Sequence, residues 1–327
     1  MHVTILGGAG FLGRKLAERI AAEGNLAGRA ISAMTLLDQV RATPPRAAFP
    51  VTVIEAGLDN FETLRTAMPE GTGVVFHLAA VVSAQAEADF HLGMRVNIEG
   101  TRNVLAAAAA LKAPPRLVFT SSVATYSGGQ DAVITDATRQ VPANSYGAQK
   151  IIGELMVHDH TRKGFVDGIS LRLPTIVVRP GRPNRAASSF ASSILREPFL
   201  GEEAALPVPE DFALFIASPR SAVGWLLHAA GLATGAVGLD RSINPPGIRA
   251  TTGEMLAALV AAGGDRGRVK RVDDKEIFDV VSPWPAKFDT ARARALGFAP
   301  QPPLNEIIGA FLEDDLAATR ALRTAGS

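Results

Sequence analysis

The chain has 327 residues, no cysteine and a formal net charge of +1. Its 47% content of hydrophobic residues supplies a sizeable core and excludes an intrinsically disordered chain. The near-neutral charge lacks the basic footprint of a general nucleic-acid binder, and without cysteine there is no disulfide or thiolate metal site. The sequence contains no apolar run of membrane-spanning length and no basic segment typical of a signal peptide. We therefore expect a cytoplasmic protein whose partners include neither nucleic acid nor membrane.

Short apolar runs alternate with longer amphipathic segments in the first half of the chain. The apolar runs predict strands at residues 3–6, 31–37, 51–55, 74–77, 117–121 and 168–173. Helical spacing predicts helices at residues 11–23, 61–68, 94–112 and 146–162. This alternation is typical of an α/β fold, a doubly wound parallel sheet with helices on both faces.

The pattern loosens after Leu173, where prolines become frequent. Helices return at residues 220–231, 252–262 and 304–320, and residues 241–244 predict a late strand. We expect residues 1–173 to form the first domain and residues 174–327 to form mostly a smaller C-terminal lobe. The late strand near residues 240–244 would rejoin the sheet of the first domain.

A glycine-rich turn follows the first strand directly and opens a helix. Gly7, Gly10 and Gly13 have the spacing that allows a tight turn, close backbone approach to a pyrophosphate and close helix–strand packing. The helix N-terminus adds amide hydrogens and a positive dipole end for the phosphates. Because the strand–turn–helix context is present, the motif predicts a dinucleotide site rather than a merely structural turn.

Two further strand ends fit the same ligand. Asp38 ends the second strand, where its carboxylate can accept hydrogen bonds from both ribose hydroxyls and would repel a 2′-phosphate. This favours NAD over NADP, although Arg41 lies nearby and a plain surface aspartate is the alternative. We interpret His77 as a packed histidine at a strand end, with a catalytic acid or base as the alternative. The small residues that follow it would let a cofactor lie against the backbone. Asn97, on the next helix, is a candidate bridge between backbone and water.

The catalytic candidates are Ser121, Ser122, Tyr146 and Lys150. Tyr146 and Lys150 are spaced i, i+4, so both project from one helical face. Removal of hydride from an alcohol requires a base for the hydroxyl proton, and a free tyrosine with a pKa of about 10 is a poor one. A lysine ammonium and a positive nicotinamide ring would lower that pKa, while a serine hydroxyl holds the substrate oxygen. A Tyr-x-x-x-Lys pair alone is common on solvated helix faces, but beside the glycine turn it predicts a catalytic site.

These motifs resemble those of the extended short-chain dehydrogenase/reductase superfamily over nearly the whole chain, including residues 289–297. The resemblance implies a Rossmann-type fold, bound NAD, and Ser122, Tyr146 and Lys150 as catalytic residues. It implies cofactor contacts from Gly7, Gly10, Phe11, Leu12, Asp38, Leu58, Leu78, Ala79, Ala80, Asn97, Ser121, Tyr146, Lys150, Pro174 and Ile176.

One position departs from the superfamily's pattern. Gly57 stands where the superfamily usually carries an aspartate that holds the adenine amino group. Asp59 would need a shifted loop to take that role. The departure concerns one adenine contact and leaves the prediction of NAD binding in place.

A narrower resemblance is to the D-erythronate dehydrogenases, long labelled as nucleotide-sugar epimerases. It rests on residues 77–83, 87–90, 164–173, 179–190, 196–203 and 217–220. It implies NAD-dependent oxidation of the C2 hydroxyl of a four-carbon sugar acid to the 2-oxo acid. The superfamily often dimerises through the helices equivalent to residues 94–112 and 146–162, so we expect a homodimer.

Two other functions remain as alternatives. One is a nucleotide-sugar epimerase with tightly bound NAD, although two Trp and two Tyr in the chain offer no obvious platform for base stacking. The other is a redox-sensing binding protein on the same fold. Such a protein would need the glycine turn but not Ser122, Tyr146 and Lys150 together.

The substrate is expected to be an anion. Residues 168–195 contain no acidic residue but carry Arg172, Arg179, Arg182 and Arg185. Guanidinium groups match a carboxylate with paired hydrogen bonds, although arginines paired with acids elsewhere are the alternative. The substrate-binding candidates are Ser83, Ser122, Tyr146, Arg179, Arg182, Ser189 and Arg220, with Ser188 as a further hydroxyl.

Three remaining features have structural interpretations. His158 and His160 are two residues apart and would point to different helix faces, so we expect no metal site. Trp284 is expected to pack within the C-terminal lobe, with a substrate lid as the alternative. The run of alanines at residues 106–110 is expected to pack a helix against the sheet, with a subunit contact as the alternative.

Overall fold

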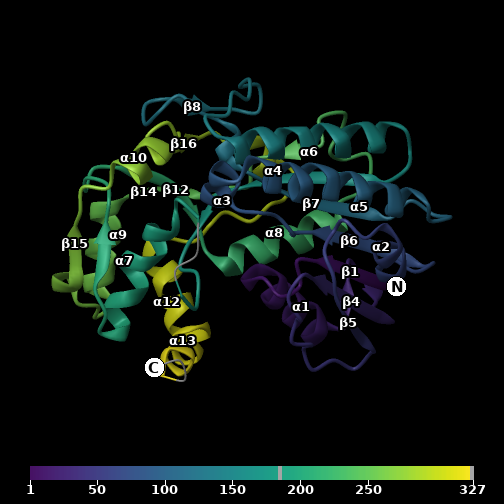
Figure 1. Ribbon diagram of the computed structural model, residues 1–327, viewed down its shortest axis with the longest axis horizontal. Coiled ribbons are helices and arrows are strands. Elements are labelled where there is room, and N and C mark those ends of the chain that lie inside the picture. Colours follow the sequence, from purple (N-terminus) through teal and green to yellow (C-terminus); the bar gives the residue numbers. More distant parts are fainter. Residues whose placement is uncertain (183–185, 325–327) are drawn as a thin grey trace.

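The computed structural model describes residues 1–182 and 186–324. Figure 1 shows a large sheet with its helices at the right and a smaller lobe at the left. The large sheet has seven strands, and all their pairings are parallel. In spatial order they are β13 (Ser242–Ile243), β9 (Asp167–Leu173), β7 (Arg116–Ser122), β6 (Thr72–His77), β1 (His2–Leu6), β4 (Ala33–Asp38) and β5 (Val51–Glu55).

The strand order reverses at β1. This strand pairs with β4 on one side and β6 on the other, so Leu6 lies opposite both Leu37 and His77. In open parallel sheets, ligands bind outside the carboxyl ends of the strands at such a reversal. The register therefore sets the ends of β1, β4 and β6 side by side at one crevice.

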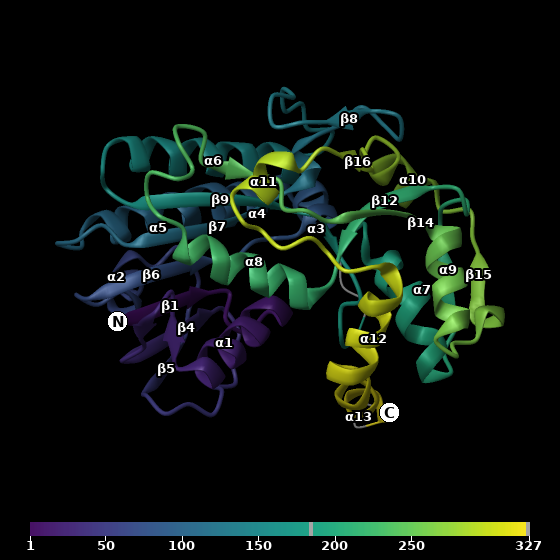
Figure 2. The same cartoon turned by 180° about the vertical axis from the view of Figure 1, so that it is seen from behind.

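Helices cover both faces of this sheet (Figures 1 and 2). On one face, α1 (Phe11–Glu23) and α8 (Pro219–Gly231) bury apolar stripes, of which Leu16, Ala17 and Ile20 form the α1 part. The other face packs against α2 (Phe61–Ala67), α5 (Gly100–Ala109) and α6 (Ser145–Arg162). These two layers confirm the doubly wound α/β fold.

The smaller lobe has its own apolar core. Its sheets contain β10 (Thr175–Ile176), β12 (Ala213–Ala217) and β14 (Ile248–Thr251), and separately β11 (Ala204–Leu206) with β15 (Val269–Arg271). Its helices are α7 (Ser189–Leu200), α9 (Thr252–Ala261), α10 (Lys275–Val281), α12 (Leu304–Asp314) and α13 (Leu316–Thr324). Between the lobes, β8 (Val133–Ile134) pairs with β16 (Lys287–Phe288).

The remaining short elements join these layers. They are β2 (Asn25–Leu26), β3 (Arg29–Ala30), α3 (Ser83–Ala88), α4 (Phe90–Gly93), η1 (Met94–Glu99), η2 (Val123–Thr125), η3 (Arg266–Arg268) and α11 (Ala291–Ala295). No helix within residues 1–182 and 186–324 is both long and apolar enough to cross a membrane.

Two predicted helices differ from the observed ones, and helix α7 was not predicted at all. The expected helix at 94–112 starts earlier, at α4, runs as a π-helix through η1 and ends at Ala109. The expected helix at 304–320 breaks at Asp315 into α12 and α13. Helix α7 was not predicted, because Pro198 made its segment look irregular, yet that proline lies near the end of the helix.

Candidate active site

The glycine turn is closed too tightly for side chains. Gly7 has a left-handed φ of +93°, and a Cβ there would lie 2.7 Å from the Ala79 nitrogen. A Cβ on Gly13 would lie 2.1 Å from the Gly7 carbonyl oxygen. Gly10 is the N-cap of α1, and no side chain caps the first turn of this helix. The bare backbone and the uncapped amides fit the pyrophosphate of a dinucleotide.

Asp38 reaches the glycine turn from the neighbouring strand. Its Oδ2 accepts a hydrogen bond of 3.0 Å from the Ala9 nitrogen, and its Oδ1 accepts one of 3.2 Å from the Val40 nitrogen. The carboxylate therefore lies at the end of β4 beside the turn, as ribose recognition requires. At the next strand end, the Asp59 carboxylate lies over Gly57, where a Cβ would be 2.5 Å from Asp59 Oδ1.

The Asn97 side chain fixes the backbone of the segment after β6 by hydrogen bonds to Val81. The Asn97 side chain accepts from the Val81 nitrogen at 2.8 Å and donates to the Val81 carbonyl at 3.1 Å and to Gln149 Oε1 at 2.7 Å. It does not line the cavity itself. Its contacts position the small residues that follow His77. Leu58, another predicted cofactor contact, does not line the cavity either and packs against Gly100.

A cavity of about 480 Å³ opens at the carboxyl ends of the strands. The first lobe supplies the glycine turn and the ends of β6 and β7, and the second lobe supplies the opposite wall. Predicted residues that line it are Gly7, Gly10, Phe11, Leu12, Leu78, Ala80, Ser83, Ser121, Ser122, Tyr146, Lys150, Pro174, Ile176, Arg179, Arg182, Ser188 and Ser189.

Ser122, Tyr146 and Lys150 meet in this cavity. Asn144 caps α6 by accepting from the Gly147 nitrogen at 2.8 Å, which starts the helix directly before Tyr146. Lys150 Nζ lies 5.6 Å from the centroid of the Tyr146 ring and 4.7 Å from that of Phe119. Ser122 ends β7, and its Oγ accepts from the Ala124 nitrogen at 3.1 Å.

Burial shifts the pKa values of the central pair in opposite directions. It raises the pKa of Tyr146 to about 12, while Arg179 and a hydrogen bond with Ser122 act to lower it. It lowers the pKa of Lys150 to about 7, against which the Glu154 carboxylate acts. Among the described residues, the strongest cationic influence on the Tyr146 pKa is therefore Arg179 rather than Lys150.

Arg179 lies at the substrate end of the cavity. Its Nε donates to the Ile176 carbonyl at 3.0 Å, and its Nη2 donates to Ser188 Oγ at 3.0 Å. Burial lowers the Arg179 pKa to about 10, which leaves the guanidinium charged at neutral pH. Arg182 lies exposed at the rim, and Ser83 Oγ accepts from the Ala187 nitrogen at 3.3 Å.

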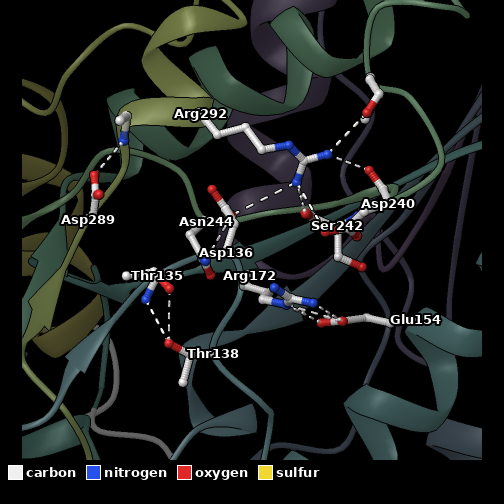
Figure 3. A network of polar contacts seen from close by, with 12 residues as sticks. Thr135, Asp136, Thr138, Glu154, Arg172, Asp240, Ser242, Asn244, Asp289 and Arg292 are labelled. Carbon is white, nitrogen blue, oxygen red and sulfur yellow. Dashed lines mark hydrogen bonds and ion pairs between the residues drawn. The ribbon is translucent and has the colours of Figure 1, made fainter.

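Two predicted anion ligands lie elsewhere. Arg220 is half exposed, and its Nη2 lies 2.8 Å from Glu313 and 2.6 Å from Asp314, outside the cavity. Arg172 is buried in a network below the cavity, where it holds Glu154 at 2.8 Å and donates to the Tyr126 hydroxyl at 2.7 Å. Figure 3 shows the Arg172–Glu154 pair and the neighbouring Asn244. Arg185 lies outside the described residues.

Two polar residues at the site were not predicted, Arg196 and Glu154. Arg196 lines the cavity although only 1% of its surface is exposed. Trp284 packs into the core of the smaller lobe, as predicted, and also forms part of the cavity wall. Glu154 lies beneath the cavity and accepts a short hydrogen bond from the Ser121 hydroxyl. Its position one helical turn after Lys150 was the available signal. The described residues contain no group of three or more His, Asp or Glu placed to hold a metal.

This sheet, with its glycine turn and Ser–Tyr–Lys cluster, defines a dinucleotide-dependent enzyme of the extended short-chain dehydrogenase type. The chain belongs to the NAD dependent epimerase/dehydratase family, whose model matches residues 3–209. This membership confirms the expected superfamily and its cofactor, NAD.

Relatives match over nearly their full length. A D-erythronate dehydrogenase from Cupriavidus necator is 47% identical and covers 96% of this chain and 98% of its own. A D-erythronate dehydrogenase from Haemophilus influenzae is 39% identical, over 97% of this chain and 100% of its own length. Among solved structures, a nucleoside-diphosphate-sugar epimerase from Agrobacterium tumefaciens is 42% identical, with a TM-score of 0.89 over 97% of this chain and 95% of that one.

Proposed function

We propose that this chain is an NAD-dependent dehydrogenase that oxidises the C2 hydroxyl of D-erythronate to the 2-oxo acid. Two relatives of nearly equal length, 47% and 39% identical, bear the name of this activity. The observation that carries the proposal for this chain is the meeting of Ser122, Tyr146 and Lys150 with the charged Arg179 in one cavity. A sugar acid needs both parts, a base for its hydroxyl and a cation for its carboxylate.

The substrate carboxylate binds at Arg179 in this proposal. A guanidinium in a low-dielectric wall recognises a carboxylate by paired, charge-assisted hydrogen bonds. The Ser188 hydroxyl already contacts Arg179 Nη2 at 3.0 Å and lies within the same recognition surface. Arg182 at the rim attracts the anion before it enters.

The C2 hydroxyl then lies between Ser122 and Tyr146. The serine hydroxyl holds the substrate oxygen, and the phenolate form of Tyr146 takes its proton. The positive charge of Arg179 favours that phenolate, although burial has the larger effect and raises the Tyr146 pKa. A protonated Lys150 and a positive nicotinamide ring would favour the phenolate further. NAD, held by the glycine turn and Asp38, supplies the acceptor for the hydride that leaves C2.

The test is turnover of D-erythronate with NAD, followed by the absorbance of the reduced cofactor. Its C2 epimer, D-threonate, tests stereochemistry, and the methyl ester of D-erythronate tests the carboxylate. We expect turnover of D-erythronate with a much higher KM for the ester. A folded protein that binds NAD but leaves D-erythronate unreacted would overturn the proposal.

A nucleotide-sugar epimerase is the second candidate, and the 42% identity to the protein from Agrobacterium tumefaciens that bears such a name supports it. This activity requires a site for a nucleoside diphosphate. Uridine or guanosine diphosphate would then raise the melting temperature of the NAD-loaded protein. Under the dehydrogenase proposal, neither diphosphate changes it.

The proposal includes a homodimer formed through α5 and α6, with the enzyme acting in the cytoplasm. The two helices lie side by side on one face of the large sheet (Figure 1). Two large apolar side chains on α6 lie on its outer surface, with Ile152 39% and Leu155 63% exposed. Contact between two copies would bury them.

A further inference from the structure

The loop of residues 179–182, here called the substrate loop, carries the proposed carboxylate ligand. We propose that Arg323, on the C-terminal helix α13, is a positioning residue that holds this loop in its binding conformation. This inference rests on the proposed function, because its expected effect is on the binding of the substrate carboxylate to Arg179.

Contacts from α7 hold the first residue of the loop. The Arg179 nitrogen donates to Ser192 Oγ at 3.0 Å, and Arg196 Nη1 donates to the Arg179 carbonyl at 2.6 Å. The backbone on both sides of the Arg179 Cα is therefore fixed. The direction in which the Arg179 side chain leaves the backbone depends on these two contacts.

Helix α13 holds the loop two residues later. The Gly181 nitrogen donates to Thr319 Oγ1 at 3.3 Å, and Arg323 Nη2 donates to the Gly181 carbonyl at 3.4 Å. Thr319 is fully buried at this contact. Gly181 has a left-handed φ of +79°, so the chain turns sharply between the two holding points.

One buried carboxylate joins the two sets of contacts. Glu197 Oε1 lies 2.6 Å from Arg196 Nη2 and 3.4 Å from Arg323 Nη2. Arg323 Nη1 also lies 3.0 Å from Glu202. The Arg196–Glu197–Arg323 group thus links the carbonyl of Arg179 to the carbonyl of Gly181 through charge-assisted hydrogen bonds.

Helix α13 is anchored to the first lobe at its other end. Asp315, at the break between α12 and α13, lies 2.7 Å from Lys15 Nζ on α1, the helix that begins at the glycine turn. Both cartoon views place α12 and α13 between α1 and α7 (Figures 1 and 2). The helix therefore sets the substrate loop relative to the cofactor side of the cavity.

The main consequence is for substrate binding. A bidentate guanidinium–carboxylate contact depends on orientation, so a loop freed at Gly181 would bind the anion more weakly. Ser122 and Tyr146 lie on β7 and α6 rather than on α13, but a displaced Arg179 would also favour the Tyr146 phenolate less. We expect Arg323→Leu to raise the KM for D-erythronate roughly 10-fold, with a smaller fall in kcat and the KM for NAD within about 2-fold.

The matched control is Arg320→Leu. Arg320 lies on the same helix and donates to the Phe199 carbonyl at 3.0 Å, but it has no contact with the substrate loop among the contacts that the structure describes. This variant should leave all three constants unchanged. Thr319→Val, which removes only the hydroxyl that accepts from Gly181, should raise the same KM by a smaller factor.

Hydrogen exchange of the peptide covering residues 177–182 gives a readout that needs no substrate. Faster exchange in Arg323→Leu than in Arg320→Leu, together with the selective rise in KM, supports the proposal. An unchanged KM for D-erythronate, or equal effects of both variants, overturns it. If the wild-type protein fails to turn over D-erythronate, the proposed function falls, and unchanged exchange would then overturn the anchoring of the loop separately.

Discussion

Tyr146 bears the chemical step in the proposed reaction, because its oxygen takes the substrate proton. Tyr146→Phe removes that oxygen and keeps the ring, so we expect kcat to fall roughly 100- to 10,000-fold. The dissociation constant for NAD should stay within a few-fold, because the glycine turn and Asp38 are untouched. Steady-state kinetics and a titration with NAD measure the two quantities.

The other tyrosine of the chain provides the control. Tyr126 is buried outside the cavity, and its hydroxyl accepts from Arg172. Tyr126→Phe should lower the free energy of unfolding and leave kcat nearly unchanged. Retained turnover in Tyr146→Phe, or an equal loss of kcat in both variants, contradicts the assignment of Tyr146 as the base.

The buried environment of His77 predicts that the free energy of unfolding falls in acid. Its Nε2 bonds to Thr101 Oγ1 at 2.9 Å, and Thr101 donates its own hydrogen to the Asn97 carbonyl, so Nε2 carries the proton. The buried Nδ1 has no hydrogen-bond partner among the described residues, and burial lowers the His77 pKa to about 3. Protonation of this ring would therefore add a hydrogen at Nδ1, where no described residue accepts it, and would bury a positive charge.

The sign of the effect follows from proton counts. Between pH 6.5 and about 3 the unfolded chain protonates His77 and the folded chain does not, so stability falls as pH falls. The slope is at most about 1.4 kcal/mol per pH unit. In His77→Leu the free energy of unfolding should depend less on pH across this range, as measured by urea titration. The exposed His91→Leu should match the wild type, and a His77→Leu curve parallel to the wild type would refute the prediction.

The site residues that could be predicted are those whose role is encoded by local spacing. Tyr146 and Lys150 share a helix face at i, i+4, and the glycine turn directly follows its strand. Arg220 could not be separated from Arg179 in this way, because its partners Glu313 and Asp314 are more than 90 residues away. Arg196 was missed for a similar reason, since its burial depends on how α7 packs.

At the scale of elements, the glycine turn and α1 act as one unit. A Cβ on Gly13 would come within 2.1 Å of the Gly7 carbonyl oxygen and 3.0 Å of the Gly8 Cα, both backbone atoms. Gly13→Ala must therefore push α1 away from the turn. We expect NAD affinity to fall at least about 10-fold and stability to fall by about 1–3 kcal/mol, measured by NAD titration and denaturant unfolding.

Gly309→Ala is the matched control on α12. A Cβ at Gly309 would meet no atom within 4 Å, so the substitution should stabilise the helix by up to about 1 kcal/mol and leave NAD affinity unchanged. Wild-type NAD affinity in Gly13→Ala would contradict the close packing of the turn.

Elements with a strong local pattern were predictable, and those fixed by distant contacts were not. Helix α1 has the predicted bounds because Leu16, Ala17 and Ile20 share one face and Gly24 ends it in a left-handed conformation. The apolar pattern of residues 304–320 continues through Asp315, but the structure breaks there, where Asp315 pairs with Lys15. This ion-pair partner lies 300 positions away, so the pairing leaves no local signal in the sequence.

At the scale of the whole molecule, the cavity belongs to both lobes. The first lobe contributes the base, the lysine and the cofactor turn, because parallel strands end at one edge of the sheet. The second lobe contributes Arg179, Ser188 and Trp284. Cofactor affinity and substrate affinity should therefore respond to different variants, as expected of Gly13→Ala and Arg323→Leu.

The proposed dimer is the last prediction, and it concerns the outer surface of α6. Leu155 is 63% exposed there, and a charge at the centre of an apolar contact would have to be buried unpaired. We expect the wild-type protein to elute with twice the chain mass in size exclusion with light scattering, and Leu155→Glu to elute as a monomer. Val260→Glu, at a 50% exposed position on α9 of the smaller lobe, should remain dimeric. A monomeric wild-type protein, or a dimeric Leu155→Glu, would show that this face does not join two copies.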